Sequence, residues 1–229
     1  MTARNSARII ISAAAIAAVV TAFSATLTGT SSSSFLVSTA HAFPTPAIAP
    51  VAWQLNFTSE LPRRITVEVP GSNVPKAFWY VTYTATNNTG TEQMFFPVIE
   101  IVDKSGNVTL ANKGVATRVF ERIQERERAR PIIFPLQIAG TILQGEDQAK
   151  FGVAVWEETD ARPGTFQIYF AGLSGEVQPL VGSDGKPAVD AEGKTITLRK
   201  TMQLEYTVRG DELYAGDPVV AGASGWVMR

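Results

Sequence analysis

One short stretch of the sequence gathers acidic and aromatic side chains densely enough to suggest chemistry. Trp156 is followed directly by Glu157 and Glu158, and Asp160 stands close behind them. A glycosidase needs two carboxylates about 5–9.5 Å apart across a sugar. Neighbouring residues on a strand point to opposite faces, so Glu157 and Glu158 cannot act together without a bend. The stretch predicts either a ligand contact made by Trp156, Glu157 and Glu158 or an ordinary solvated strand end.

A second pattern has oxygen ligands at a spacing that could suit calcium. Asp103, Ser105 and Asn107 stand at alternate positions around Gly106. A full calcium loop needs a later bidentate acid, and position 114 is a glycine. We therefore expect a hairpin turn here and no metal site.

The composition excludes several kinds of catalysis. The chain has one histidine, His41, and no cysteine. If His41 is removed with a signal peptide, the mature chain has neither the Ser-His-Asp and Cys-His catalytic sets nor the usual zinc, copper and iron–sulfur ligands. A Ser–Lys hydrolase needs no histidine, and Ser183 and Lys186 have the required spacing. They lie in a glycine-rich turn, however, where neither side chain would be buried enough to lower the pKa of the lysine. We expect no cofactor.

Four tryptophans could form a stacking platform for a carbohydrate. They are Trp53, Trp79, Trp156 and Trp226. Trp53 and Trp79 fall on the apolar faces of their expected strands, which favours a place in the core for these two. Trp156 and Trp226 are less determined by their surroundings.

The first segment has the three parts of a secretory signal peptide. Arg4 and Arg8 precede an apolar run over residues 9–23, and a Ser/Thr-rich stretch leads to the small residues Ala40 and Ala42. The alternative is an uncleaved anchor, but fifteen apolar residues make a helix of about 22 Å, short of the roughly 30 Å bilayer core. We predict cleavage between Ala42 and Phe43, export to the periplasm or the medium, and no membrane span afterwards.

The rest of the chain divides into a short leader and one domain. Residues 43–50 carry three prolines among small residues and should form an extended leader before a single domain over residues 51–229. The formal net charge is −1, so nothing suggests a nucleic-acid partner, which normally requires a basic face.

Alternation of apolar and polar residues predicts strands along most of this domain. It is clear over residues 53–58, 65–69, 78–86 and 165–170. Residues 94–102 are apolar on both faces, as in a covered central strand, although Pro97 requires an edge or a bulge. Residues 103–107 should close a hairpin into residues 108–110. Residues 116–129 are the exception, because their apolar spacing predicts a helix that Pro131 ends.

Two features mark the last third of the chain. Turn residues cluster twice between residues 176 and 195, which suggests a long hairpin tip or flap. No internal repeat is evident in the sequence. The alternation over residues 196–209 would make a strand of about 50 Å, far longer than usual. Lys200 is the one charged residue on its apolar face, so we expect a bulge or bend there.

One stretch of the chain has the sequence Trp79-Tyr80-Val81-Thr82-Tyr83-Thr84-Ala85-Thr86-Asn87-Asn88-Thr89-Gly90. This stretch resembles a strand and turn found in uncharacterised exported bacterial immunoglobulin-like β-sandwich proteins. The resemblance covers about a dozen residues and implies a fold but no activity. With the strand count and the turn spacing, it predicts a mainly β, immunoglobulin-like antiparallel sandwich with one inserted short helix.

These observations predict a non-catalytic exported binding or structural module of the cell envelope or periplasm. A protein partner could add a strand at a sheet edge. The alternatives are a hydrolase that uses carboxylates alone and a carbohydrate-binding module, both acting on envelope glycans. Two carboxylates facing one cleft would favour the enzyme, and a row of exposed tryptophans would favour glycan binding.

Overall fold

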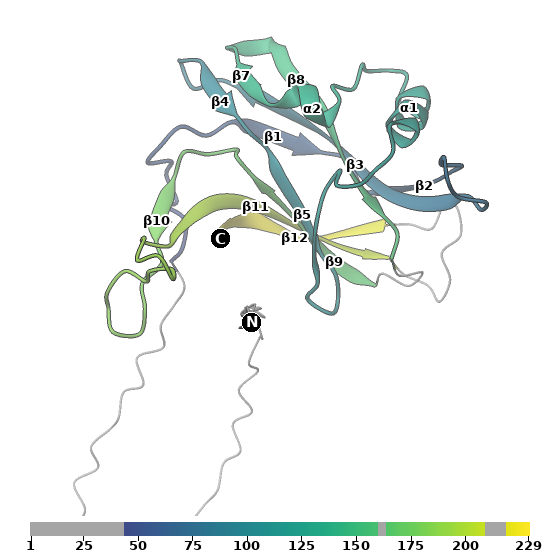
Figure 1. Cartoon of the computed structure of the whole chain (residues 1–229). Helices are drawn as coiled ribbons and strands as arrows, with labels where there is room; N and C mark the ends of the chain where they lie inside the picture. The colour runs from purple at the N-terminus through teal and green to yellow at the C-terminus, as the bar shows by residue number, and fades with distance from the viewer. Residues whose placement is uncertain (1–43, 160–163, 209–218) are drawn as a thin grey trace, which may run out of the picture. The chain divides into compact units, whose positions relative to one another are not determined.

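The computed structural model describes residues 44–159, 164–208 and 219–229, and it is mainly β with antiparallel sheets and two helices (Figure 1). Its sandwich-like architecture confirms the fold class that alternation predicted. His41, Ala42, Phe43 and Asp160, named above, lie outside the described residues. In the described part, no helix is both long and apolar enough to span a membrane.

The first sheet is built around the long strand β3 and is called the β3 sheet here. Its strands are β1 (Asn56–Ser59), β2 (Arg63–Val67), β3 (Lys76–Asn87) and β8 (Gly145–Glu157). β8 pairs with β3 along most of its length, so β1 and β2 share the other edge of β3. All pairings in this sheet are antiparallel.

The second sheet is called the β9 sheet. Its strands are β5 (Val98–Val102), β6 (Val108–Leu110), β9 (Thr165–Ala171), β10 (Val177–Pro179), β11 (Thr197–Val208) and β12 (Val219–Met228). They run in the order β10-β11-β9-β5-β6, and β12 pairs with β11. β5 and β6 form the expected hairpin.

Two expectations about the long strands differ from the structure, the first in the position of an irregularity and the second in its kind. β11 is one continuous strand, and its irregularity lies between Leu204 and Tyr206 rather than at Lys200. The run over residues 94–102 is two strands, because it breaks at Pro97, which has no N–H to donate to a ladder. Its first part, β4 (Gln93–Phe95), pairs with β7 (Gly140–Ile142), and its second part is β5.

The main core lies between the β3 sheet and the β9 sheet. Alternate residues of β3 and β9 fill it, and the ring centroids of Tyr83 and Phe170 are 5.5 Å apart. Trp79 packs similarly on Phe166, at 6.2 Å. The alternation that predicted these strands therefore also identified the residues that join the two sheets.

A second core lies on the other face of the β3 sheet, beneath helix α1 (Thr117–Arg126). Val119, Phe120 and Ile123 of this helix pack against Phe78 and Tyr80 of β3. The helix falls within the residues predicted for it. A second helix, α2 (Pro135–Ile138), was not expected, and it is too short for its periodicity to be visible in the sequence.

Asn112 connects the two sheets where β6 approaches β8. Its backbone φ is 66°, a left-handed conformation that asparagine tolerates. Its N–H donates to the carbonyl oxygen of Val155 at 2.7 Å, and its Oδ1 accepts from the N–H of Val155 at 2.9 Å. The side chain thus takes the place of a paired strand at this edge of β8.

The predicted flap over residues 176–195 folds into two turns closed by a ring of main-chain hydrogen bonds. Leu180 donates to Ile196, Ile196 to Ala188, and Ala188 to Leu180, at 2.7–2.9 Å. These three residues are eight apart, and the turns between them share the pattern Val-x-x-acid-Gly-Lys. This short repeat was missed in the sequence.

Candidate functional site

The three described residues of the acidic and aromatic stretch, Trp156, Glu157 and Glu158, each contact another part of the protein. Trp156 is buried, and its Nε1 donates to the carbonyl oxygen of Thr109 at 3.1 Å. Glu157 is exposed and pairs with Lys76 at 2.7 Å. Glu158 accepts two hydrogen bonds from Arg64, at 2.6 and 2.9 Å.

Glu157 is the last residue of β8 and lies opposite Phe78, whereas Glu158 follows the strand, and the two glutamates pair with different cations, Lys76 and Arg64. A cavity of about 60 Å³ lies against Trp156, Glu157 and Glu158. Ligand sites are commonly about 300–1,000 Å³, so this cavity is too small to enclose a sugar. Asp103 and Glu158 also line it, but the Asp103 carboxylate accepts hydrogen bonds within its own turn and Glu158 pairs with Arg64. Of the three side chains only Glu157 is solvated, since Trp156 is buried and Glu158 pairs with Arg64.

The tryptophans do not form an exposed row. Trp79 and Trp156 are buried in the main core, and Trp53 and Trp226 are half-buried against it. The predicted core place of Trp79 is confirmed.

The Asp103 turn is a hairpin, as expected. Both carboxylate oxygens of Asp103 accept hydrogen bonds within the turn, from the N–H groups of Ser105 and Asn107 and from the Asn107 side chain. These contacts hold the turn between β5 and β6 closed.

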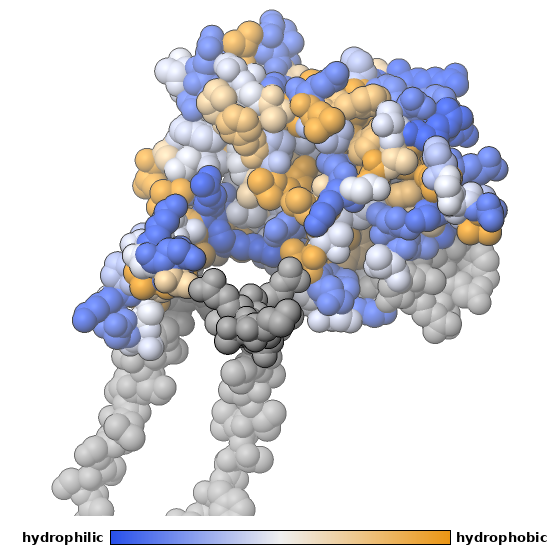
Figure 2. Space-filling model, in the orientation of Figure 1, coloured by the Kyte–Doolittle hydropathy of each residue, from blue (hydrophilic) through white to orange (hydrophobic). Residues whose placement is uncertain are grey.

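An apolar groove of about 580 Å³, called the α2 groove here, lies between the β5–β6 hairpin and the two helices. Phe120 and Phe134 line its floor, and Val98, Leu110 and Leu136 lie on its rim with 48, 44 and 97% of their surface exposed. Figure 2 shows apolar side chains grouped on this face, over β5 and α2. Lys113 is the only charged residue among the described residues that line the groove.

A polar groove of about 750 Å³ lies on the β3 sheet beyond the part that α1 covers. Hydroxyl and amide side chains from β1 and β3 lie side by side along it, since Asn56 pairs with Thr86 and Thr58 with Thr84 on these neighbouring strands. Glu146 is the only carboxylate among its described lining residues. Arg130, Ile132, Ile133 and Phe151 also line the groove, so it is suited to a ligand that has both hydroxyl groups and apolar faces, as sugars have.

The most unusual cluster of charges surrounds Lys200. Glu176 and Lys200 each expose only 2% of their surface, and the Lys200 Nζ lies 2.9 Å from the Glu176 Oε2. β10 pairs with β11, which places Glu176 opposite Lys200, and the Lys200 N–H donates to the Glu176 carbonyl oxygen. The Lys200 Nζ also lies 5.4 Å from the centroid of the Trp226 ring.

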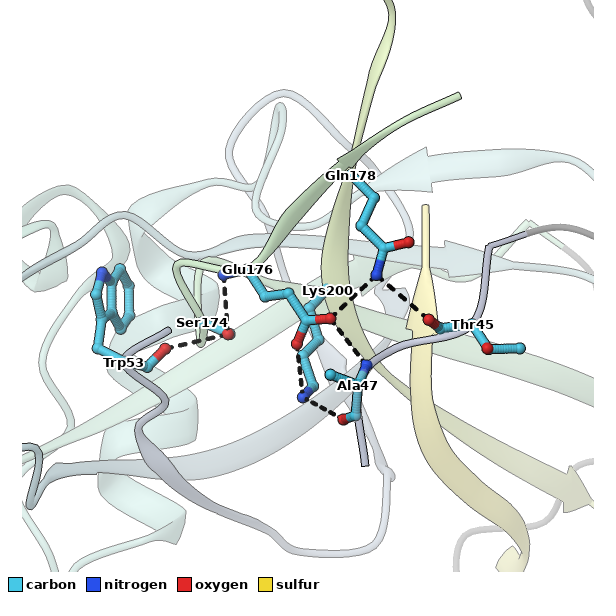
Figure 3. Close-up of polar contacts among 7 residues, drawn as sticks. All are labelled: Thr45, Ala47, Trp53, Ser174, Glu176, Gln178 and Lys200. Atoms are coloured by element: carbon cyan, nitrogen blue, oxygen red, sulfur yellow. Dashed lines mark hydrogen bonds and ion pairs between the residues drawn. The ribbon is translucent and has the colours of Figure 1, made fainter. Parts of the chain in front are cut away.

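This ion pair holds the main chain of the N-terminal segment, defined as residues 44–50 (Figure 3). The Ala47 N–H donates to the Glu176 Oε1 at 2.8 Å, and the Ala47 carbonyl oxygen accepts from the Lys200 Nζ at 3.2 Å. Gln178 donates to both the Thr45 carbonyl oxygen and the Glu176 carboxylate, at 3.3 and 3.2 Å. Glu176, Gln178 and Lys200 are called the clamp.

The clamp keeps Glu176 ionised. The Ala47 N–H, followed by Lys200, lowers the pKa of the Glu176 carboxyl below its ordinary value of 4.5. Burial raises the pKa of this carboxyl, but by less than these contacts lower it. A carboxylate that accepts several donors is more stable than the protonated acid, which would lose them.

The clamp was missed in the sequence, although Lys200 was recognised as a charge on an apolar face. A buried charge needs a partner, so Lys200 was a signal for an acidic residue nearby in space. Nothing in the local pattern pointed to Glu176, which lies 24 residues earlier. The N-terminal segment is 153 residues from Lys200 and gave no signal of a contact.

The chain matches no protein-family model, and no curated protein or solved structure is significantly similar to it.

Proposed function

We propose that this chain is a non-catalytic, exported binding module of the cell envelope, and that its α2 groove holds an apolar segment of a partner protein. The observation that carries the proposal is the exposed apolar rim of the groove. Leu136 is 97% exposed there, beside Val98 and Leu110. Soluble proteins rarely leave apolar side chains grouped around a concave surface unless a ligand or a partner covers them.

The charge in the groove indicates what the partner segment carries. Lys113 is the single charge among the described lining residues, and it stands among aromatic and aliphatic side chains. An apolar segment with one acidic residue would bury its side chains on Phe120 and Phe134 and pair its carboxylate with Lys113. Such a pair sets the orientation of the bound segment more than its affinity.

Binding of designed peptides tests this proposal. The probes are two ten-residue peptides of alternating leucine and serine, one with a central glutamate and the other with a central lysine. Calorimetry should show that the wild-type chain binds the glutamate peptide, and that Leu136→Asp weakens this binding at least tenfold. Lys113→Glu should reverse the preference between the two peptides.

Val74→Asp is the matched control, because Val74 is 67% exposed and does not line the α2 groove. It should leave peptide binding unchanged. Equal binding by the Leu136→Asp and Val74→Asp variants would contradict the proposal. In intact cells, a photo-crosslinker at position 136 should give a defined protein adduct that the same group at position 74 does not give.

The polar groove supports a second candidate function, which is binding of an envelope glycan. The adjacent hydroxyl and amide side chains of β1 and β3 offer both donors and acceptors, as sugar hydroxyls require. Soluble glycan fragments of the envelope should then bind the wild-type chain more tightly than an Asn56→Ala/Thr58→Ala variant. A constant number of reducing ends during incubation would separate binding from hydrolysis.

Export is part of the proposal and rests on residues 1–42, with cleavage between Ala42 and Phe43. The resemblance of residues 79–90 to exported immunoglobulin-like proteins supports the same proposal of export. The N-terminus of the protein recovered from the periplasm or the medium should be Phe43, and Ala42→Phe should block processing. Recovery of a chain that keeps residues 1–42 would contradict this part.

A further inference from the structure

The clamp contacts the N-terminal segment almost entirely through the main chain. Glu176 accepts from the Ala47 N–H, Lys200 donates to the Ala47 carbonyl oxygen, and Gln178 donates to the Thr45 carbonyl oxygen. The clamp thus satisfies both main-chain groups of one residue, as a neighbouring strand would. Recognition of this kind depends on an extended backbone more than on particular side chains.

The clamp is a built site rather than a surface contact. Glu176 and Lys200 are 2% exposed, and each has a polar atom within hydrogen-bond distance of Ala47. Two charges are costly to remove from water, and the donors and acceptors around them offset that cost. The β10–β11 pairing and the hydrogen bond from the Lys200 N–H to the Glu176 carbonyl oxygen hold the two residues opposite each other whether or not the segment is bound, so the site is pre-organised for its occupant.

The segment in the clamp has the features of an element that can leave it. The chain that follows is open to solvent, since Ile48 is fully exposed and Val51 is 74% exposed. Pro44, Pro46 and Pro50 restrict the backbone to extended conformations and carry no N–H. The segment therefore keeps its shape without the clamp and loses little entropy when it binds.

We propose that the clamp is a peptide-binding site whose exchangeable occupant is the N-terminal segment, so that the segment of a second copy of this chain can take the place of the chain's own. Each copy in such a pair would fill the clamp of the other, which gives a closed two-fold dimer. This inference does not depend on the α2 groove, because the clamp and the described lining of that groove share no residue.

The first experiment frees the clamp and fills it from outside. Ala47→Pro removes the N–H that donates to Glu176, so it should release the segment. A blocked peptide with the sequence of residues 44–50 should bind this variant at least tenfold more tightly than the wild-type chain, by calorimetry. The same peptide with proline in place of Ala47 should bind neither.

Ala49→Pro is the matched control, because Ala49 is an exposed residue of the same segment outside the clamp contacts. It should bind the peptide as weakly as the wild-type chain does. Failure of a folded Ala47→Pro variant to bind the peptide would overturn the proposal. So would binding that persists after Glu176→Gln and Lys200→Met are added.

The second experiment needs no variant and keeps the test valid if Ala47→Pro does not fold. The exchange of the Ala47 amide hydrogen with solvent should become faster as the peptide is added to the wild-type chain. Two differently tagged wild-type copies, incubated together at high concentration, should form mixed dimers that excess peptide dissociates. A constant exchange rate and a chain that stays monomeric would overturn the proposal.

Discussion

Two ion pairs of this protein have nearly the same length and very different surroundings. The Lys76–Glu157 pair spans 2.7 Å, and 41 and 47% of its two side chains are exposed. The Lys200–Glu176 pair spans 2.9 Å, and each side chain is 2% exposed. The first lies in the stretch that is conspicuous in the sequence, whereas the second involves a glutamate with no visible signal.

The difference shows that burial, and not the distance between the charges, decides what an ion pair does. Water already solvates Glu157 and Lys76, so their contact adds little. Glu176 has exchanged water for the Ala47 N–H, Lys200 and Gln178, so the loss of Lys200 leaves a buried carboxylate without its cation. The ion pair that matters most for stability is therefore the one that the N-terminal segment covers.

The largest effect should come from removing one charge of the buried pair. We expect Lys200→Met to lower the free energy of unfolding by about 2–3 kcal/mol, because it leaves the Glu176 carboxylate buried without its cation. The value lies below that of deeply buried pairs because a single chain segment covers this one. Urea unfolding measures it, and Lys200→Met/Glu176→Met should recover most of the loss. A double variant no more stable than the single one would contradict this account.

Acid should break the same contact without any substitution. The pKa of Glu176 is lower in the folded protein than in the unfolded chain, so its stabilisation is present above pH 4.5 and is lost as the pH falls through the lower, folded value. The N-terminal segment should stay bound at pH 4.5 and leave at lower pH. The chemical shift of the Ala47 amide follows this release. Release that begins well above pH 4.5 would contradict the direction of the shift.

The Arg64–Glu158 pair tests the intermediate case. Its side chains are 23 and 10% exposed, and two hydrogen bonds join them. We expect Arg64→Met to lower the free energy of unfolding by about 1–2 kcal/mol, because the glutamate is partly buried and loses charged donors. Thermal or urea unfolding provides the measurement, and a loss as large as that of Lys200→Met would undo the ranking by burial.

The smallest effect should come from the exposed pair. Lys76→Met should change the free energy of unfolding by less than about 0.5 kcal/mol, and 1 M salt should remove even that difference. Urea unfolding at low and high salt compares the two conditions. A loss above 1 kcal/mol would mean that Glu157 has a role that its exposure does not explain.

Local patterns in the sequence predicted much of the fold correctly. β3 and β9 follow from their alternation, α1 from its apolar spacing, and the β5–β6 hairpin from its turn residues. Each of these signals depends on neighbours a few residues apart. They also predicted which side chains of β3 and β9 face the main core.

The errors arose where a distant contact overrides the local pattern. The apolar run over residues 94–102 belongs to two sheets, and Met94, Phe96 and Val98 on one side of it are exposed. Lys200 does not bend its strand, because Glu176 neutralises it in place. The α2 groove depends on a helix of four residues, too short to leave a pattern in the sequence.

The sequence alone determined the fold class, the positions of most strands and the absence of cysteine, since these depend on composition and on short periods. Only the tertiary structure determined that Glu176 and Lys200 meet, that residue 47 lies against both, and that the α2 groove is open. The reason is physical: a side chain's neighbours along the chain set its local conformation, but its charge and its exposure depend on residues that the fold brings from up to 153 positions away.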